Sequence, residues 1–460
     1  MDARFLPIPL IPLLLAALVT AGPAARADDM APPQDVAPAR QSAASTAGAP
    51  ALTLVELTDL ALRLNPKTRQ SWAAIRNSEA GVTLAKAGYW PQVDADLTLS
   101  RSRPLNFSGQ NAATQTRYGA SVSLSYLLWD FGLRSGTVEQ AEFELTSAQL
   151  SQNQTFQDVI LQVEQSYYQA LGLAAVVDAD RQSLNDATTN LAAAQERRKS
   201  GLATVGDVYQ ADAALAGARL ALQQAEGQLA TARGTLAAAV GYTPDTDLSL
   251  APWEVPVKGE MPQLNMATLL EDARDARPEL LASKAQEQAA AANVKATRGK
   301  GLPNLSLDAN AGETHVQSVG SSTQFNGLLT LTVPLFAGFA DRAAISQAQA
   351  QLESARANTA ELRSEVELEV WQAYQDLRTA AVTLDTSAAQ LKSAQLAADV
   401  TSERYKNGLD TILDVLSAQT TLANARVQQV QARLDWAAGR AALGHAVGGL
   451  KAPASTMESQ

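Results

Sequence analysis

Cysteine is absent from the 460 residues of this sequence, and histidine occurs only twice, as His315 and His445. The lack of cysteine excludes disulfide bonds, cysteine-ligated zinc, thiol catalysis and lipid attachment through a cysteine. Two histidines are too few for a histidine-rich metal site, so we expect no bound metal. We expect His315 to lie in a loop between strands and His445 near a helix end.

Basic clusters and catalytic motifs are also lacking. The net charge is −11, with 36 lysines and arginines against 47 aspartates and glutamates, and no segment is dense in basic residues. Because phosphate groups are bound by basic surfaces, this charge excludes a nucleic-acid partner. The sequence shows no catalytic triad, phosphate-binding loop or dinucleotide-binding motif, which argues against an enzyme and against a bound cofactor.

Only one long apolar run occurs, at residues 9–21, and the small-residue sequence ARA follows it at 25–27. This run is too short to span a bilayer and is typical of an export signal, so we predict a signal peptide at 1–27. The alternative is an N-terminal hydrophobic anchor. Residues 28–50 are rich in proline, alanine and serine and are predicted to be a disordered linker, and residues 451–460 a loose C-terminal tail.

Proline is missing from residues 105–243 and 335–452, which are rich in alanine, leucine, glutamine and glutamate. Such stretches can form uninterrupted helices, and we predict two unusually long ones at 134–199 and 341–405. Small or apolar residues in the second stretch recur at alternating steps of three and four, the heptad pattern of coiled coils. The residues of this seam are Ile345, Ala348, Leu352, Ala355, Thr359, Leu362 and Val366.

The chain contains an internal duplication. The phrase RRKSGLATVGDVYQAD at 197–212 returns as RYKNGLDTILDVLSAQ at 404–419, with eight identical positions at a spacing of 207 residues. Glycine tolerates the left-handed conformation that ends a helix, so we interpret each phrase as the tip of a helical hairpin. We predict two repeats, 52–250 and 265–450, joined by a linker at 251–264. Each repeat is expected to contain a helix, two strands and two long helices.

Four segments alternate between apolar and small polar residues, as strands with two different faces do. Such strands fit either a soluble sandwich or a membrane barrel, and their length of about ten residues suits a bilayer crossing. Four strands cannot close a barrel and open strand edges are not tolerated in lipid, whereas three chains would supply twelve strands. The segments are 92–100, 118–128, 304–311 and 325–333.

This organisation resembles the TolC-like outer-membrane channel family, in its non-lipidated form, over nearly all of residues 52–450. The resemblance implies a mainly α-helical chain that contributes four strands to a trimeric, twelve-stranded membrane β-barrel, continued by a long α-helical coiled-coil barrel. Its marks are the NP and YWP sequences at 65–66 and 89–91, the LLWDFG and PLFAGF turns at 127–132 and 334–339, and the paired phrases.

The resemblance also implies the protein's location and partners. It places a homotrimer in the lipid of the outer membrane of a Gram-negative bacterium, extending into the periplasm. There it would join a periplasmic adaptor and an inner-membrane transporter in a tripartite export system, without catalysis. Aromatic residues near the expected strand ends suit the membrane interface, or ordinary packing. They are Tyr89, Trp90, Tyr126 and Trp129.

By this resemblance Asp207, Tyr405 and Asp414 match the family's periplasmic gate and constriction. A tyrosine hydroxyl that donates to a carboxylate of a neighbouring hairpin would act as a latch. Three copies of Asp414 could form an acidic ring that favours cations; alternatively, both aspartates are acids that stabilise helix N-termini. The sequence departs from the family at Asp410, where an arginine is usual, and at Ser417, where a second acid is common. Nearby basic residues, Arg404 or Lys406, could substitute.

The tips are also the expected contact surface for the adaptor. An exposed leucine at a tip can serve as a docking anchor. The alternative is that the glycines and leucines only complete a helix stop. The expected contact residues are Gly201, Leu202, Thr204, Gly408, Leu409 and Thr411.

We therefore expect an exit duct of a tripartite system, and favour small-molecule efflux over type I protein secretion. Two readings outside this family remain open at the level of sequence. One is a periplasmic coiled-coil scaffold without a pore, and the other is an enzyme with a small sheet on helical arms.

Overall fold

The structure is a computed structural model that describes residues 51–103, 114–251, 265–317 and 320–449. The predicted signal peptide, the predicted disordered linker and the predicted C-terminal tail lie outside the described residues. The predicted linker at 251–264 also lies outside them, apart from its first residue.

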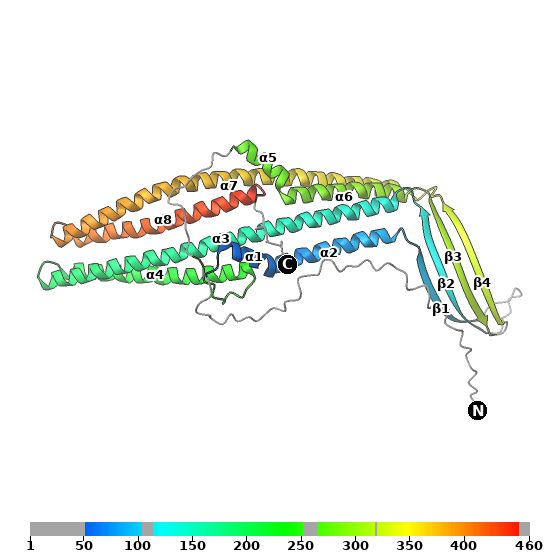
Figure 1. Ribbon diagram of the computed structural model, residues 1–460, viewed down its shortest axis with the longest axis horizontal. Coiled ribbons are helices and arrows are strands. Elements are labelled where there is room, and N and C mark those ends of the chain that lie inside the picture. The colour runs from blue at the N-terminus through cyan, green and yellow to red at the C-terminus, as the bar shows by residue number, and fades with distance from the viewer. Residues whose placement is uncertain (1–50, 104–113, 252–264, 318–319, 450–460) are drawn as a thin grey trace, which may run out of the picture. The chain divides into compact units, whose positions relative to one another are not determined.

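The same order of elements occurs twice along the chain: two short helices, two strands and two long helices (Figure 1). The first set is α1 (Leu54–Leu64), α2 (Pro66–Ala87), β1 (Gln92–Ser102), β2 (Gln115–Trp129), α3 (Leu133–Lys199) and α4 (Val205–Val240). The second set is α5 (Met266–Ala276), α6 (Pro278–Lys300), β3 (Asn304–Val316), β4 (Gly320–Thr332), α7 (Ala340–Lys406) and α8 (Ile412–Ala446).

The single helix expected before each pair of strands is in fact two helices. Asn65 has an extended backbone (φ −64°, ψ 131°) and caps α2, which begins at Pro66. Arg277 and Pro278 occupy the same positions between α5 and α6. A proline disfavours the helical conformation of the residue before it but suits the first position of a new helix, so each helix breaks there.

The long helices agree closely with the prediction, because α3 and α7 each run for 67 residues without interruption. All residues of the predicted heptad seam in α7 are buried or half-buried. Both long helices begin after two successive left-handed residues, Phe131 and Gly132 before α3, and Gly338 and Phe339 before α7. The spacing of 207 residues therefore holds at this corner, although glycine and phenylalanine have exchanged places.

The four strands form one antiparallel sheet in the order β1-β2-β3-β4, which lies at one end of the long helices (Figure 1). All four strands extend further than expected at the end of the sheet away from the helices, and β4 begins five residues early, at Gly320. His315 lies in β3 rather than in a loop, and its ring stacks on Tyr118 at 4.7 Å. The expectation for His315 was wrong because the ladder continues past the alternating segment, pairing His315 with Ser321.

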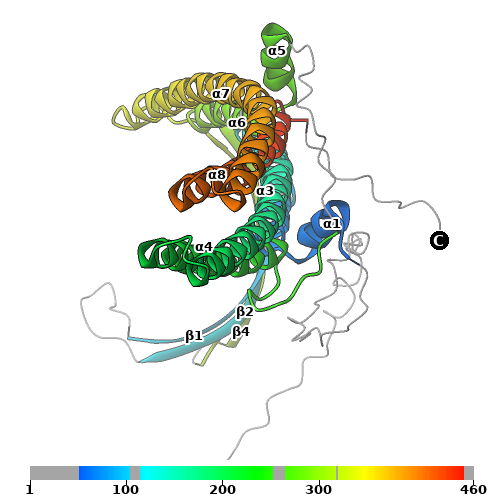
Figure 2. The same ribbon diagram turned by 90° about the vertical axis from the view of Figure 1, so that its left-hand side faces the viewer.

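The helices pack side by side, and the hairpin tips lie at the end away from the sheet (Figure 1). Next to the sheet, α3 packs against α2 and α6; towards the tips it packs against α4 and α8 (Figure 2). Each repeat has its own apolar core, one around Leu57, Val163 and Leu236 and the other around Val370 and Leu384. In the described part of the chain, no helix combines the length and the apolar character that a bilayer crossing requires.

Candidate functional site

At each hairpin tip one long helix ends and the next helix begins within a few residues. Gly201 (φ +75°) and Gly408 (φ +77°) adopt the left-handed conformation that ends α3 and α7. The amide of Leu202 donates to Arg197 O at 2.8 Å, and the amide of Leu409 donates to Arg404 O at 2.9 Å. These bonds satisfy carbonyls that the last turn of a helix leaves free, so the doubled phrase encodes the same reversal twice.

The two aspartates of the predicted gate belong to capping boxes. The amide of Thr204 donates to Asp207 Oδ2 at 2.6 Å, and the amide of Asp207 donates to Thr204 Oγ1 at 3.2 Å. Thr411 and Asp414 repeat this arrangement at the start of α8. Hydrogen bonds from the Thr411 hydroxyl and amide lower the pKa of Asp414. The carboxylates stabilise their own helices in this conformation, and their role in a constriction stays a prediction.

The residues predicted to contact an adaptor are gathered at the two tips. Leu202 is 68% exposed and Leu409 is 67% exposed, so neither leucine is packed into its own hairpin. Gly201, Gly408 and Thr411 are exposed beside them. The tips therefore expose two equivalent apolar side chains, and their contact with an adaptor stays a prediction.

Tyr405 is enclosed between the two hairpins. Its side chain is only 6% exposed, and its hydroxyl has no hydrogen-bond partner among the described residues. Burial and the nearby Asp207 raise the pKa of Tyr405, although Arg197 acts in the opposite direction. The hydrogen bond expected between this hydroxyl and a carboxylate is therefore not formed in this conformation.

Arg197 makes the link between the hairpins that the sequence suggested for Tyr405. Its Nη1 donates to Tyr405 O at 2.5 Å and to Lys406 O at 3.3 Å, and its Cζ lies 4.6 Å from the centre of the Tyr405 ring. The cation thus binds the carbonyl end of α7 and the face of an aromatic ring together. Arg197 is the first residue of the repeated phrase 197–212. Its contact with Tyr405, 208 residues away, could not be predicted from the neighbouring sequence.

The unusual acid at position 410 has a partner in its own tip. Both carboxylate oxygens of Asp410 accept hydrogen bonds at 2.9 Å from Arg404. This bidentate contact raises the pKa of Arg404, with a smaller contribution from Asp414. Arg404 therefore neutralises Asp410 within its own tip, and its substitution for the family's arginine in the gate stays a prediction.

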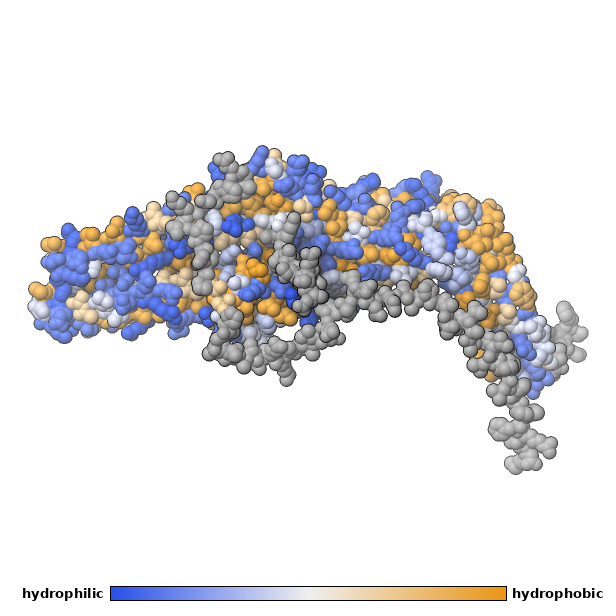
Figure 3. Space-filling model, viewed as in Figure 1, coloured by the Kyte–Doolittle hydropathy of each residue, from blue (hydrophilic) through white to orange (hydrophobic). Residues whose placement is uncertain are grey.

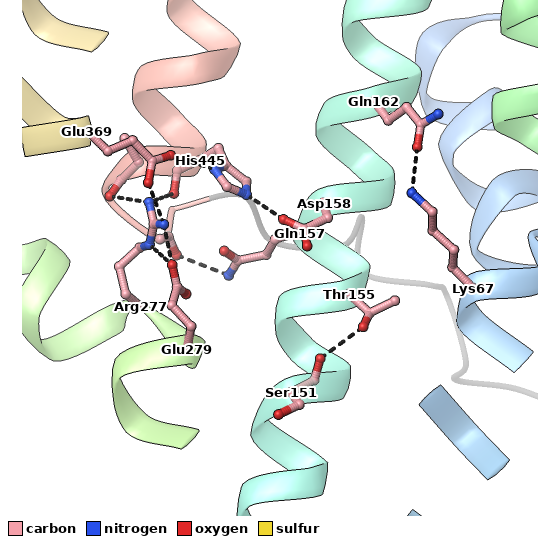
Figure 4. A network of polar contacts seen from close by, with 12 residues as sticks. Lys67, Ser151, Thr155, Gln157, Asp158, Gln162, Arg277, Glu279, Glu369 and His445 are labelled. Carbon is pink, nitrogen blue, oxygen red and sulfur yellow. Dashed lines mark hydrogen bonds and ion pairs between the residues drawn. The ribbon is translucent and has the colours of Figure 1, made fainter. Parts of the chain in front are cut away.

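A second polar cluster, which the sequence did not indicate, lies where α8 ends (Figure 4). Arg277 forms ion pairs with Glu279 and, at 2.7 Å, with Glu369, and it donates to Ala446 O at 3.0 Å. His445 extends the cluster: its Nε2 lies 2.9 Å from Asp158 Oδ1 on α3, and its Nδ1 lies 3.4 Å from Glu369 Oε1. The cluster, named here the ionic clasp, ties α6, α7 and α8 to α3 of the first repeat.

The matching place in the first repeat has hydrogen bonds in place of the ion pairs of the ionic clasp. There Asn65 Nδ2 donates to Ala239 O at 2.8 Å. Lys67 Nζ donates to Gln162 Oε1 at 3.3 Å (Figure 4). Asn65 corresponds to Arg277 in the repeat, and both bind the carbonyl end of a helix. The second repeat has therefore kept this contact while gaining buried charge around it.

Electrostatics hold the ionic clasp in its charged form. Burial alone would lower the pKa of His445, but the hydrogen bonds to Asp158 and Glu369 outweigh it and raise this pKa to about 9. The hydrogen bond from His445, with help from Arg277, lowers the pKa of Glu369 to about 2. At neutral pH His445 is therefore protonated and Glu369 is ionised.

Comparison with known proteins identifies this architecture. The family model described as outer membrane efflux protein matches residues 57–242 and 269–449, which correspond to the two sets of elements. The chain belongs to the outer membrane efflux protein family. Members of this family are channels rather than enzymes, and they are the outer-membrane components of tripartite export systems.

Individual relatives agree with this assignment. The chain is 32% identical over 383 residues to protein CyaE of Bordetella pertussis, covering 82% of this chain and 80% of that protein. It is 28% identical over 400 residues to the outer membrane efflux protein BepC of Brucella suis, covering 85% and 84%. The fold matches that of the outer membrane protein VceC of Vibrio cholerae with a TM-score of 0.75 at 21% identity, covering 86% and 96%. This outer membrane efflux protein is therefore an outer-membrane exit duct, and the pore-free scaffold and the enzyme are excluded.

We predict that Arg197→Gln loosens the contact between the two hairpin tips. The variant removes the cation that binds Tyr405 and the end of α7, so single-channel conductance should rise severalfold in planar bilayers. Arg198→Gln is the matched control, because it removes an exposed neighbouring arginine. Equal conductance in the two variants would show that Arg197 does not restrain the tips.

We predict that stability depends on pH through His445. Its pKa is raised from 6.5 to about 9, so its contribution is complete below pH 6.5 and disappears as the pH rises through 9. A shift of this size corresponds to at most about 3 kcal/mol. Thermal unfolding followed by tryptophan fluorescence between pH 6 and pH 10 should show this loss in the native protein and in His315→Gln. His445→Gln should show a flatter profile; a profile as steep as that of the native protein would contradict the assignment.

Proposed function

We propose that this outer membrane efflux protein forms a homotrimeric exit duct for small molecules, working with a periplasmic adaptor and an inner-membrane transporter. The observation that carries the trimer is the four-stranded sheet. Both of its outer strands, β1 and β4, lack a second neighbour within the described part of the chain. Unpaired strand edges cannot be left in a lipid environment.

One face of the sheet is suited to lipid. Leu97, Leu99 and Phe325 are 88%, 78% and 79% exposed, and all three lie on the same face according to the strand register. Figure 3 shows hydrophobic side chains gathered over the sheet. The opposite face carries small polar residues such as Ser121 and Asn310, as expected for a water-filled lumen.

Three copies satisfy both requirements together. Pairing β4 of one copy with β1 of the next would remove every free edge and close a barrel of twelve strands, an even number as antiparallel closure requires. The sheet lies at the end of α3 and α7 (Figure 1), so the same threefold arrangement would continue the pore between the long helices.

The hairpin tips are the proposed site of gating and of adaptor docking. They are at the end of the helices away from the sheet, where a periplasmic partner can reach them. Leu202 and Leu409 would anchor the adaptor, and Gly201, Thr204, Gly408 and Thr411 would shape the contact. Asp207, Tyr405 and Asp414 would restrict the entrance, with Arg197 as an additional restraint.

Small-molecule efflux is supported by the relative BepC, which is named an efflux protein. The face of the sheet opposite Leu97 offers serine, asparagine and a few acids such as Asp94 and Asp308. Substrate choice would then belong to the inner-membrane transporter. The alternative is that the same duct exports proteins. Experiment can distinguish the two substrate classes.

The purified protein should be a trimer that conducts ions in planar bilayers. In the native protein we expect a preference for cations, and Asp414→Asn should reduce it severalfold. Asparagine can still accept the capping hydrogen bond from Thr411, so the variant removes charge without removing the helix cap. A monomer without conductance would contradict the proposed duct, and an unchanged cation preference would remove Asp414 from the constriction.

The cargo can be tested in the same experiment series with a strain that lacks this chain. Small-molecule efflux predicts accumulation of fluorescent dyes and increased sensitivity to antibiotics, restored by the native gene. Loss of a secreted polypeptide with unchanged dye accumulation would instead establish protein secretion.

A further inference from the structure

A basic groove runs between α7 and α8, in the half of these helices nearer the tips, and is bordered by α3. Its volume is about 490 Å³, and none of the described residues that line it is acidic. Its polar lining consists of three basic residues and three glutamines. They are Gln182, Lys392, Gln395, Arg426, Gln429 and Arg433.

Two of the three basic side chains have no acidic partner. Within the described part of the chain, neither Lys392 nor Arg433 forms an ion pair or a side-chain hydrogen bond. The Nε atom of Arg433 is moreover shielded from solvent and has no hydrogen-bond partner. A donor removed from water without an acceptor is unfavourable, and an acceptor bound in the groove would relieve this cost.

The third basic residue, Arg426, is already held by its neighbours. Its Nη1 lies 3.0 Å from Asp186 Oδ2 on α3, and its Nη2 donates to Gln395 Oε1 at 3.5 Å. Gln395 in turn donates to Asp399 at 3.0 Å. Neither of these two acids forms an ion pair with Lys392 or Arg433, so two positive charges in the groove stay without a counter-ion.

The internal repeat relates this groove to the first hairpin. The long helices α3 and α7 both have 67 residues, and α4 and α8 begin after equivalent capping boxes. The spacing of 207 residues therefore holds from the start of each long helix through its tip. It matches Ala388 of α7 with Arg181 of α3, and Arg433 of α8 with Glu226 of α4.

The first hairpin has a complete ion pair at these positions. Arg181 Nη2 and Glu226 Oε1 lie 3.3 Å apart. In the second hairpin, alanine replaces the charged residue of the long helix, and the residue of the returning helix has the opposite sign. Both Ala388 and Arg433 line the groove. The second hairpin thus contains a cation without its counter-ion, beside a small residue that leaves space for one.

We propose that this groove binds a small divalent anion through carboxylate or phosphate oxygens. The anion would lie over Ala388 and accept hydrogen bonds from Arg433 and Lys392. The planar guanidinium group of arginine matches the spacing of oxygens in carboxylates and phosphates. Gln429 is only 4% exposed, and its amide supplies a further polar group at the base of the groove.

A bound anion would also join two helices, because Lys392 belongs to α7 and Arg433 to α8. We therefore expect the anion to raise the unfolding temperature of the protein. The site consists of residues of a single chain, so it goes beyond the proposed duct and does not depend on the trimer or on the cargo.

Isothermal titration calorimetry on the purified full chain in a non-ionic detergent tests the site. The probes are sodium phosphate and sodium succinate, each compared with sodium chloride at equal ionic strength. We expect one anion per chain for at least one probe, and the probe that binds distinguishes phosphate from carboxylate recognition. Arg433→Gln should raise the dissociation constant about tenfold or more, because it removes a charged hydrogen-bond donor.

The matched control for this variant is Arg378→Gln, which removes an exposed arginine of α7 outside the groove and should bind the probe as the native protein does. The proposal is overturned if neither probe binds more tightly than chloride, or if the two arginine variants bind equally well.

A second variant supplies the missing counter-ion from the chain itself. Ala388→Glu places a carboxylate in the groove, where it can pair with Arg433 as Glu226 pairs with Arg181. This variant should lose anion binding although all three basic residues remain. Its unfolding temperature should no longer rise when the probe is added. Ala397→Glu, at an exposed position of α7 outside the groove, introduces the same charge and should respond to the probe as the native protein does.

Unchanged anion binding in Ala388→Glu would contradict the proposed position of the anion. The results for this site and for the duct can be told apart. A monomeric protein without conductance that still binds one anion per chain would disprove the duct and support the site. A conducting trimer that binds neither probe would support the duct and disprove the site.

Discussion

The edge of a sheet has backbone N–H and C=O groups without partners, and these groups must be hydrogen-bonded in lipid. The rest of the structure depends on this constraint. The four strands expose apolar residues such as Leu97 on one face, which suits lipid, yet within the described part of the chain β1 and β4 each have only one neighbouring strand. Water can satisfy such an edge but lipid cannot. The proposed trimer would pair these edges with those of neighbouring copies, and the long helices that follow the strands would share its threefold symmetry.

The duplication gives both halves of the chain the same order of elements. The two repeats nevertheless differ where their surroundings differ. Asn65 and Arg277 hold equivalent helix ends, yet only Arg277 is surrounded by carboxylates and a protonated histidine. Likewise Arg197 finds Tyr405 across the hairpins, whereas its counterpart Arg404 turns back to Asp410. Both charged contacts, that of Arg277 with Glu369 and that of Arg197 with Tyr405, join helices of one chain.

Much of the fold could be predicted because its signals are local. The proline-free stretches gave the long helices to within a residue at each end, and the heptad seam around Leu352 lies on a covered face. The break at Pro66 was missed because the residues on both sides favour a helix. The outer parts of the strands were missed because β3 near His315 and β4 near Ser321 depart from clean alternation, and only pairing with a neighbour makes them strands.

Sequence alone determined the long helices, the two tips and the helix caps, since each depends on residues within a few positions, as Thr411 and Asp414 show. Tertiary structure decided which side chains form contacts between the two repeats. The links of Arg197 to Tyr405 and of His445 to Asp158 join residues more than 200 positions apart. Such pairs depend on how one hairpin lies against the other, and many polar residues along the same helix faces could have served equally well. The pairs that form are those in which burial removes a charge from water, because such a charge must have a partner within hydrogen-bond distance.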